Sequence, residues 1–211
     1  MLALPDGATG LAIGDVMGHD LAAAAAMGQV RSVLRSYAWE GDPPARALER
    51  LDRLVQGLGM ADLATCVYAR LEGADAARRA PGGPAAVTWS NAGHHAPLLR
   101  TPDGRVRELD DGAGLMIGVG RFSSGGRHGA AEHERTEGRT ALEPGSVLLL
   151  YTDGLVERRG SDLEVGLGEV RQRLAAHDPA RWSAALTRDL ARRLLERGLD
   201  DDACLLAVHV R

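Results

Sequence analysis

The stretch ATGLAIGDVMGHD, residues 8–20, carries the first decisive pattern, because an apolar run passes directly into a turn with glycine, aspartate and histidine. Residues 8–17 predict a short buried strand that ends in this turn. Asp20 then stands where it can cap a following helix. The segment 21–40 predicts that helix, since four residues recur in it at helical spacing: Met27, Val30, Leu34 and Tyr37.

A second helix is expected directly afterwards. Asp42, Pro43 and Pro44 provide a cap and a first turn that tolerates proline, and residues 46–58 continue with helical periodicity. Two adjacent helices after one strand indicate a helical layer.

The pattern then changes to short extended runs separated by glycine, proline and aspartate, which predict strands of a mostly antiparallel sheet or pair of sheets. These runs are residues 63–71, 85–93, 97–101, 105–109 and 146–152. Residues 73–84 and 121–139 are polar and rich in glycine, so we expect loops there. Residues 163–176 and 180–197 predict helices, and a last strand follows the acidic turn at 200–202. This order favours an α+β layered domain.

Composition limits the function. The 211 residues, of which 45% are hydrophobic, predict one domain over residues 1–211. A net charge of −4, with only 3% aromatic residues, argues against a nucleic acid or a membrane surface as partner. The N-terminal residues predict neither a signal peptide nor a membrane span. Cys66 and Cys204 match no zinc or disulfide spacing, so we expect a cytoplasmic protein.

Three acidic turns, each beside an apolar strand, are the most informative chemical feature. They contain Asp15, Asp153 and the run 200–202. A carboxylate at the mouth of a buried strand is expected to be partly desolvated, which is costly unless it is paired or binds a cation. The chain has no lysine, so a hard divalent cation such as Mg²⁺ or Mn²⁺ is the expected compensating charge.

The order of motifs resembles the catalytic domain of SpoIIE-type Ser/Thr protein phosphatases, the bacterial branch of the metal-dependent PPM family, over nearly the whole chain. The resemblance implies an α+β fold, a four-layer α-β-β-α sandwich with two central, mostly antiparallel sheets and a site for two Mn²⁺ or Mg²⁺ ions. It also implies a phosphorylated anti-anti-sigma-factor-like regulator as partner. The matching segments are GDVMGHD (14–20), DLATCVYARL (62–71), WSNAGHHAPLL (89–99), LEPGSVLLLYTDGLVERRG (142–160) and DDACLL (201–206).

Residue by residue, the resemblance implies that Asp15 is a bridging carboxylate and that the backbone carbonyl of Val16 is the neighbouring ligand. Asp153 and Asp201 would complete the shell of one metal. Cys204 stands where the family has threonine, an exchange that a buried strand position tolerates. Asp202 would cap the turn or support the ligands, and a shift of one position along the acidic run stays open.

Two divalent ions that share a water would lower its pKa, and the resulting hydroxide would attack phosphorus in line, without a covalent intermediate. Both Cys66 and Cys204 are expected inside apolar strands, where neither is a nucleophile. His19 is a candidate to protonate the leaving serine oxygen through a water. Its alternative is an ordinary turn residue at the start of a helix.

Other residues near these motifs have simpler interpretations. His94 and His95 are expected in a loop that packs under the site. Glu157 could orient a metal-bound water, but a solvated charge is the more common outcome. Met17 and Met27 are expected in the core. The pair at 110–111 is expected on the surface.

The sequence departs from the family pattern at its front. The family's first motif, Gly-Gly-Asp-x-Tyr-Asp, would stand shortly before residue 3, so the domain is expected to be N-terminally truncated. Asp6 is the only carboxylate there, and LPDG predicts a hairpin turn. Absence of that strand would remove a metal ligand and expose a sheet edge. Two alternatives to an active protein phosphatase therefore stay open: a pseudophosphatase that only binds a regulatory protein, and a metallohydrolase of small phosphate esters. The oligomeric state is not determined by the sequence.

Overall fold

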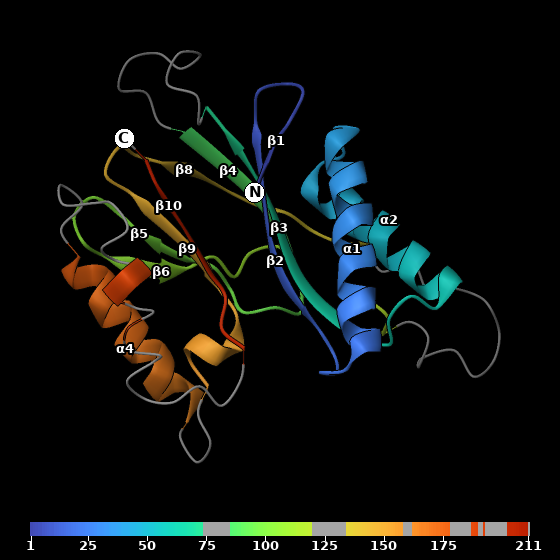
Figure 1. Ribbon diagram of the computed structural model, residues 1–211. Coiled ribbons are helices and arrows are strands. Elements are labelled where there is room, and N and C mark those ends of the chain that lie inside the picture. The colour runs from blue at the N-terminus through green and yellow to red at the C-terminus, as the bar shows by residue number, and fades with distance from the viewer. Residues whose placement is uncertain are drawn as a thin grey trace. The chain divides into compact units, whose positions relative to one another are not determined.

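The computed structural model describes residues 1–73, 85–119, 134–157, 162–177, 187–189, 192 and 202–210. The chain forms two compact units, and each is built from separate stretches of sequence. The first unit contains Met1–Arg78, Ala86–His94 and Asp110–Thr140; the second contains Arg79–Ala85, His95–Leu109 and Ala141–Arg211. Both units contain a β-sheet and helical structure (Figure 1).

The sheet of the first unit has the strand order β1-β2-β3-β4-β7, and β8 also pairs with β4. The pairs from β1 to β4 are antiparallel, whereas β7 runs parallel to β4. The strands are β1 (Leu2–Ala3), β2 (Thr9–Val16), β3 (Ala64–Glu72), β4 (Ala85–Ala92), β7 (Ala113–Gly114) and β8 (Gly138–Leu142).

Strand β2 is paired very differently on its two sides. On one side it pairs with β3 over its whole length, from Thr9 opposite Leu71 to Val16 opposite Ala64. On the other side, β1 pairs with it only at Thr9 and Gly10. The turn between β1 and β2 is the predicted hairpin, in which Asp6 accepts a hydrogen bond from the Ala8 N–H at 3.1 Å.

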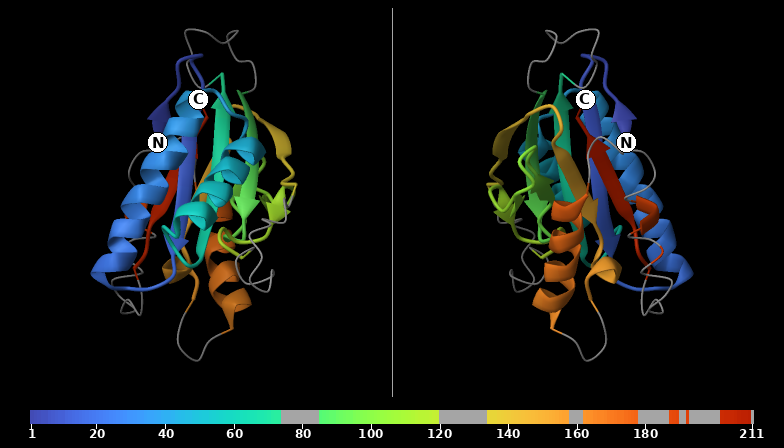
Figure 2. Two further views of the ribbon diagram at one scale, coloured as in Figure 1. Left: turned by 90° about the vertical axis from the view of Figure 1, so that its right-hand side faces the viewer. Right: turned by 90° about the vertical axis from the view of Figure 1, so that its left-hand side faces the viewer.

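Helices α1 (Leu21–Trp39) and α2 (Pro44–Leu58) lie against one face of this sheet (Figure 2). Their inward residues join those of β2, β3 and β4 in one core; examples are Val30, Leu34, Leu51 and Val55. Asp20 caps α1 as predicted, since its side chain accepts the Ala23 N–H at 2.8 Å. The core therefore fixes the helix that follows the Asp15 turn.

The predicted cap of α2 is wrong. The N-cap residue is Pro43, and Asp42 instead binds the Arg50 guanidinium at 2.6 Å. The Ala45 N–H in the first turn donates to the carboxylate of Glu137, 92 residues away, at 2.8 Å. Proline cannot offer a side-chain oxygen, so a distant carboxylate supplies the acceptor that the helix start needs.

Helix α2 also holds a buried ion pair. The Arg135 guanidinium, whose side chain is 3% exposed, binds Asp52 at 3.0 Å. Asp52 accepts two further hydrogen bonds at 2.8 Å, from the Gly118 N–H and from the Gln56 amide. One carboxylate on α2 thus binds residues near both β7 and β8.

The second unit has the strand order β10-β9-β5-β6, and its three pairs are antiparallel. Its core is formed mainly by leucine and valine from β5, β9 and α4. Asp162 caps α4 by accepting the Glu164 N–H. The elements are β5 (Leu98–Arg100), β6 (Val106–Glu108), β9 (Val147–Tyr151), the 3₁₀ turn η1 (Asp153–Leu155), α4 (Leu163–Ala176) and β10 (Leu205–His209).

Most predicted elements are confirmed, including the helix over residues 163–176. The loop predicted over 121–139 is wrong at its end, because Gly138 and Arg139 begin β8. Residues 120–133, most of the 73–84 loop and most of the 180–197 helix lie outside the described residues, although 187–189 are helical. No helix in the described part of the chain combines the length and apolar character that crossing a membrane requires. That residues 1–211 form one domain stays a prediction.

Candidate active site

Asp15 lies at the end of β2, where the sheet gives way to the turn before α1. Its Oδ1 accepts the N–H of Val16 at 2.9 Å, and the next residue, Met17, still donates to the Leu63 carbonyl at 3.0 Å. Gly18 then turns the chain with φ +110°, a conformation that favours glycine. The Asp15 residue is exposed, so the expected desolvation of this carboxylate is wrong. A cation is favoured here because the Asp15 carboxylate offers oxygen ligands on an exposed residue near the end of β2.

The turn places His19 between Gly18 and the capping Asp20, and His19 is exposed. An exposed imidazole next to the Asp15 turn is accessible to a substrate, and its predicted role as proton donor stays a prediction. Met17 is 60% exposed, so its prediction as a core residue is wrong. Met27, in contrast, packs against the core of the first unit as predicted.

Asp153 lies two residues after the end of β9, at the first position of η1, in the second unit. Its Oδ1 accepts the Gly154 N–H at 2.7 Å, and its carbonyl accepts the N–H groups of Val156 and Glu157, also at 2.7 Å. These bonds form the η1 turn and hold the carboxyl-bearing residue in a defined backbone conformation. Glu157 is exposed, which agrees with a solvated charge.

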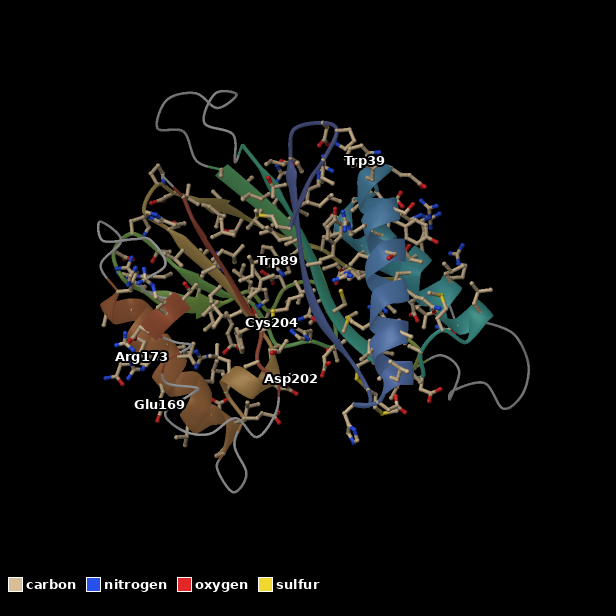
Figure 3. All side chains as sticks on the ribbon, viewed as in Figure 1. Trp39, Trp89, Glu169, Arg173, Asp202 and Cys204 are labelled. Carbon is tan, nitrogen blue, oxygen red and sulfur yellow. The ribbon has the colours of Figure 1, made fainter. Side chains whose placement is uncertain are left out.

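The start of β10 is attached directly beside Asp153. Thr152 donates its N–H to the Cys204 carbonyl at 3.0 Å, and its hydroxyl accepts the Cys204 N–H at 2.8 Å. Figure 3 shows Asp202 and Cys204 at this end of β10. The structure therefore places Asp202, the one residue of the predicted acidic run that it describes, near the end of β9 within one unit. Asp201 itself lies outside the described residues.

The two cysteines differ from the prediction and from each other. Cys66 is buried in β3, and burial raises the pKa of its thiol to about 12. Cys204 is exposed and precedes β10, so its predicted place inside a strand is wrong. The Cys66 thiol stays protonated at neutral pH, which agrees with its predicted lack of nucleophilic character.

His94 and His95 follow β4, and the structure gives them separate surroundings. Thr65 Oγ1 and His94 Nδ1 are 2.8 Å apart. The His95 ring stacks on Tyr151, with ring centroids 5.6 Å apart. The sequence prediction of simple packing fits His95, but it missed the contact of His94 with Thr65, which only the pairing of the strands reveals.

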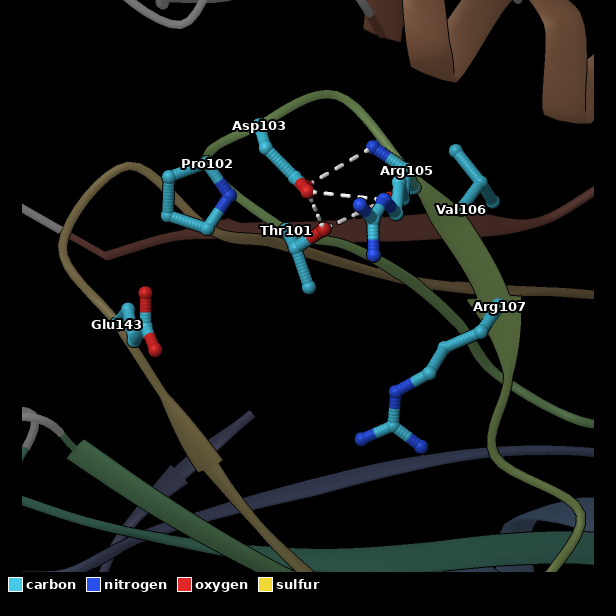
Figure 4. A pocket seen from close by; sticks show the side chains of 7 residues that line it. All are labelled: Thr101, Pro102, Asp103, Arg105, Val106, Arg107 and Glu143. Atoms are coloured by element: carbon cyan, nitrogen blue, oxygen red, sulfur yellow. Dashed lines mark hydrogen bonds and ion pairs between the residues drawn. The ribbon is translucent and has the colours of Figure 1, made fainter.

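A pocket of about 440 Å³ lies elsewhere in the second unit, around the turn between β5 and β6 (Figure 4). Asp103 in this turn accepts hydrogen bonds from the Thr101 hydroxyl and the Arg105 N–H, and the Thr101 bond is the main reason that its pKa is lowered. The pocket contains none of the predicted site residues. Its lining consists of Thr101, Pro102, Asp103, Arg105, Val106, Arg107 and Glu143.

The chemistry of the donors fits a hard divalent cation, because Asp15, Asp153 and Asp202 all offer carboxylate oxygens at strand ends. Among the residues that the structure describes, however, no group of three or more His, Cys, Asp or Glu side chains is placed to hold a metal ion. Asp15 belongs to the first unit and Asp153 to the second. The assignment of Asp15, Val16, Asp153 and Asp201 as ligands thus stays a prediction.

Comparison with known proteins gives a consistent result. The family described as stage II sporulation protein E (SpoIIE) matches residues 5–211. The structure of the RsbU and RsbW domains of Rv1364c from Mycobacterium tuberculosis is 32% identical, with a TM-score of 0.77. That match covers 98% of this chain and 53% of the other, so this chain spans about half the length of that relative.

Two further structures show the same fold at lower identity. The SiaA-PP2C domain of Pseudomonas aeruginosa is 20% identical with a TM-score of 0.67, and the match covers 96% of this chain and 76% of the other. The PP2C phosphatase domain of SpoIIE from Bacillus subtilis is 14% identical with a TM-score of 0.69, covering 96% and 55%. These matches confirm the predicted α+β fold class, and the protein phosphatase class is that of the family.

Proposed function

Because the chain belongs to the SpoIIE family, we propose that it is a metal-dependent phosphatase that hydrolyses phosphoserine or phosphothreonine on a regulatory protein. The proposed substrate is a cytoplasmic regulator of the anti-anti-sigma-factor type. Support comes from the RsbU and RsbW domains in the 32% identical relative. The observation that carries the proposal is that two acidic residues of the family motifs lie at the ends of core strands: Asp15 is the next-to-last residue of β2, and Asp153 begins the η1 turn two residues after β9.

In this proposal the ligands are the carboxylates of Asp15, Asp153 and Asp201 and the backbone carbonyl of Val16. Asp15 and Val16 are the last two residues of β2, and Asp153 begins the η1 turn. Mg²⁺ or Mn²⁺, two ions in a complete site, would supply an activated water and neutralise the charge of the phosphate. A structure of RsbX, 15% identical to this chain, contains magnesium.

His19 is the proposed proton donor to the leaving serine or threonine oxygen. It lies four residues after Asp15 in the same turn and is exposed. The imidazole of a histidine can carry a proton near neutral pH, and a water can bridge the remaining distance to the leaving oxygen.

The direct test replaces Asp153 by asparagine. Asp153→Asn keeps the shape of the side chain and its acceptor for the Gly154 N–H, but removes the negative charge that a cation needs. We expect Mn²⁺-dependent release of phosphate from an aryl phosphate and from a phosphorylated regulator to be lost. Asp110→Asn makes the same change at an exposed position, and it should leave turnover unchanged. Turnover of Asp153→Asn at the wild-type rate would refute the assignment.

A pseudophosphatase is the second candidate, and the short β1 favours it. Among the described residues, β2 pairs with β1 only at Thr9 and Gly10, whereas its Asp15 end pairs only with β3. Titration calorimetry with Mn²⁺ separates the candidates. Two binding sites together with turnover support the phosphatase, whereas one site or none without turnover supports a binding module. Turnover of small phosphate esters but not of a phosphoprotein would support a metallohydrolase.

A further inference from the structure

The turn after β4 is built to hold His94 in one position. The Asn91 side chain accepts the His94 N–H at 2.7 Å and donates to the His94 carbonyl at 2.8 Å. Asn91 is buried, and its own N–H donates to the Gly112 carbonyl at 2.9 Å. Gly93 has φ +69°, and a side chain there would overlap Met116. Both backbone polar groups of His94 are therefore held by one buried side chain.

The imidazole of His94 in turn contacts Thr65, at 2.8 Å between Nδ1 and Oγ1. Thr65 pairs directly with Asp15 across the antiparallel strands β3 and β2. Side chains in such a pair have Cβ atoms about 4.5–5.5 Å apart. Asp15, Thr65 and His94 consequently form a polar row over the ends of β2, β3 and β4, entirely within the first unit.

Threonine is stiff at χ1, because both its hydroxyl and its methyl group branch from Cβ. The contact with His94 selects the rotamer that directs the hydroxyl to Nδ1. That rotamer also determines which Thr65 group faces the Asp15 carboxylate. The orientation of a metal-ligating carboxylate depends on such neighbours, and loss of one typically costs 10- to 100-fold in metal affinity or activity.

We propose that His94 is a positioning residue for the metal centre: through Thr65, it fixes the surroundings of the Asp15 carboxylate. This inference rests on the proposed function, because it takes Asp15 as a metal ligand. It assigns to His94 a role that the sequence alone predicts as packing, and it leaves to His95 the stacking on Tyr151.

The test measures Mn²⁺ affinity of the whole chain by titration calorimetry, separately from phosphatase turnover. Thr65→Val and His94→Ala should each weaken Mn²⁺ binding by about 10- to 100-fold. The double variant should bind Mn²⁺ no less tightly than the single variant with the lower affinity, because both changes break the same contact. Thr88→Val is the matched control, since it makes the same change on β4, opposite Arg70 rather than Asp15.

Two replacements of His94 separate its ring nitrogens. Asparagine places a polar atom close to the position of Nδ1, so His94→Asn should restore Mn²⁺ affinity to within about threefold of wild type. Glutamine places its polar atoms nearer to Nε2, so His94→Gln should bind as weakly as His94→Ala. Thermal unfolding of every variant shows whether the fold is retained. Rescue by asparagine is not expected of a histidine that only fills space.

The outcomes are distinct. Wild-type affinity in Thr65→Val and His94→Ala would overturn the positioning role, even if the wild-type chain is an active phosphatase. Rescue by glutamine rather than asparagine would also overturn it. Weakened Mn²⁺ binding with asparagine rescue would support the role, even if the wild-type chain releases no phosphate and the proposed function fails. A wild-type chain that binds no Mn²⁺ would overturn both.

Discussion

Gly93 has a backbone conformation that other residues adopt only at a cost. Its φ of +69° lies in the left-handed region, and a Cβ would overlap the Met116 side chain. Gly28, inside α1, has the opposite surroundings: a Cβ there would meet nothing within 4 Å. The same substitution should therefore have opposite effects at the two positions.

We expect Gly93→Ala to lower the free energy of unfolding by about 1–3 kcal/mol, through backbone strain and the overlap with Met116. Gly28→Ala should raise it by about 0.5–1 kcal/mol, because alanine loses less conformational entropy in a helix. Urea denaturation of both variants beside the wild type measures the two changes. Equal effects of the same sign would contradict the role assigned to the Gly93 turn.

Individual residues could be predicted where the signal is local. Asp20 as a helix cap and Asp6 in a hairpin turn both depend on groups two or three positions away, and both are confirmed. The contact between Thr65 and His94 could not be predicted, because it depends on how β3 and β4 pair. The exposure of Asp15 was also missed, although Val16, the last residue of the same strand, is buried.

At the scale of elements, α2 depends on one buried charge. Asp52 is the partner of Arg135, and it also accepts the Gly118 N–H and the Gln56 amide. Removing it would leave a guanidinium that is only 3% exposed without its anion. Such a loss is far more costly than the loss of an exposed ion pair.

Asp52→Ala should lower the free energy of unfolding by about 3 kcal/mol or more. Arg139→Ala, which removes an exposed ion pair with Glu72 on β3, serves as the control and should change it by less than about 0.5 kcal/mol. Thermal and urea denaturation give both values. A destabilisation by Asp52→Ala no larger than that of the control would show that the buried pair does not stabilise α2.

The existence of α1, α2 and α4 follows from periodicity, which is a local signal. The start of α2 shows a feature that this local signal does not predict, namely which side chain caps the helix. Asp42 precedes two prolines and has the right chemistry for a cap, but its carboxylate binds Arg50 while Glu137 accepts the Ala45 N–H. Glu137 lies 92 residues from Ala45 in the sequence, so no residue near the helix start predicts this contact.

For the whole molecule, the important feature is that the two units are interleaved in sequence. The second unit uses His95–Leu109 and Ala141–Arg211, with residues of the first unit between them. Strand β9 pairs with β5 on one side and with β10 on the other. Leu98 of β5 also belongs to the core that contains β9 and α4.

A fragment of residues 141–211 should therefore not fold alone. It lacks β5 and β6, so β9 loses one neighbour and the core loses Leu98. We expect poorly dispersed amide resonances and no cooperative thermal transition, in contrast to the whole chain. A cooperative transition of the isolated fragment would show that the second unit is independent of the segment 95–109.

The interleaving also affects synthesis on the ribosome. Strand β5 ends at Arg100, but β9 begins only at Val147. At roughly 5–20 residues per second, the intervening residues take about 2–10 seconds to emerge. During that time the edge of β5 that will pair with β9 is exposed on the nascent chain. Chaperones bind such exposed strand edges, and aggregation can start from them. Because of this strand order, the unpaired edge of β5 needs a chaperone during translation, whereas in the folded protein β9 covers that edge.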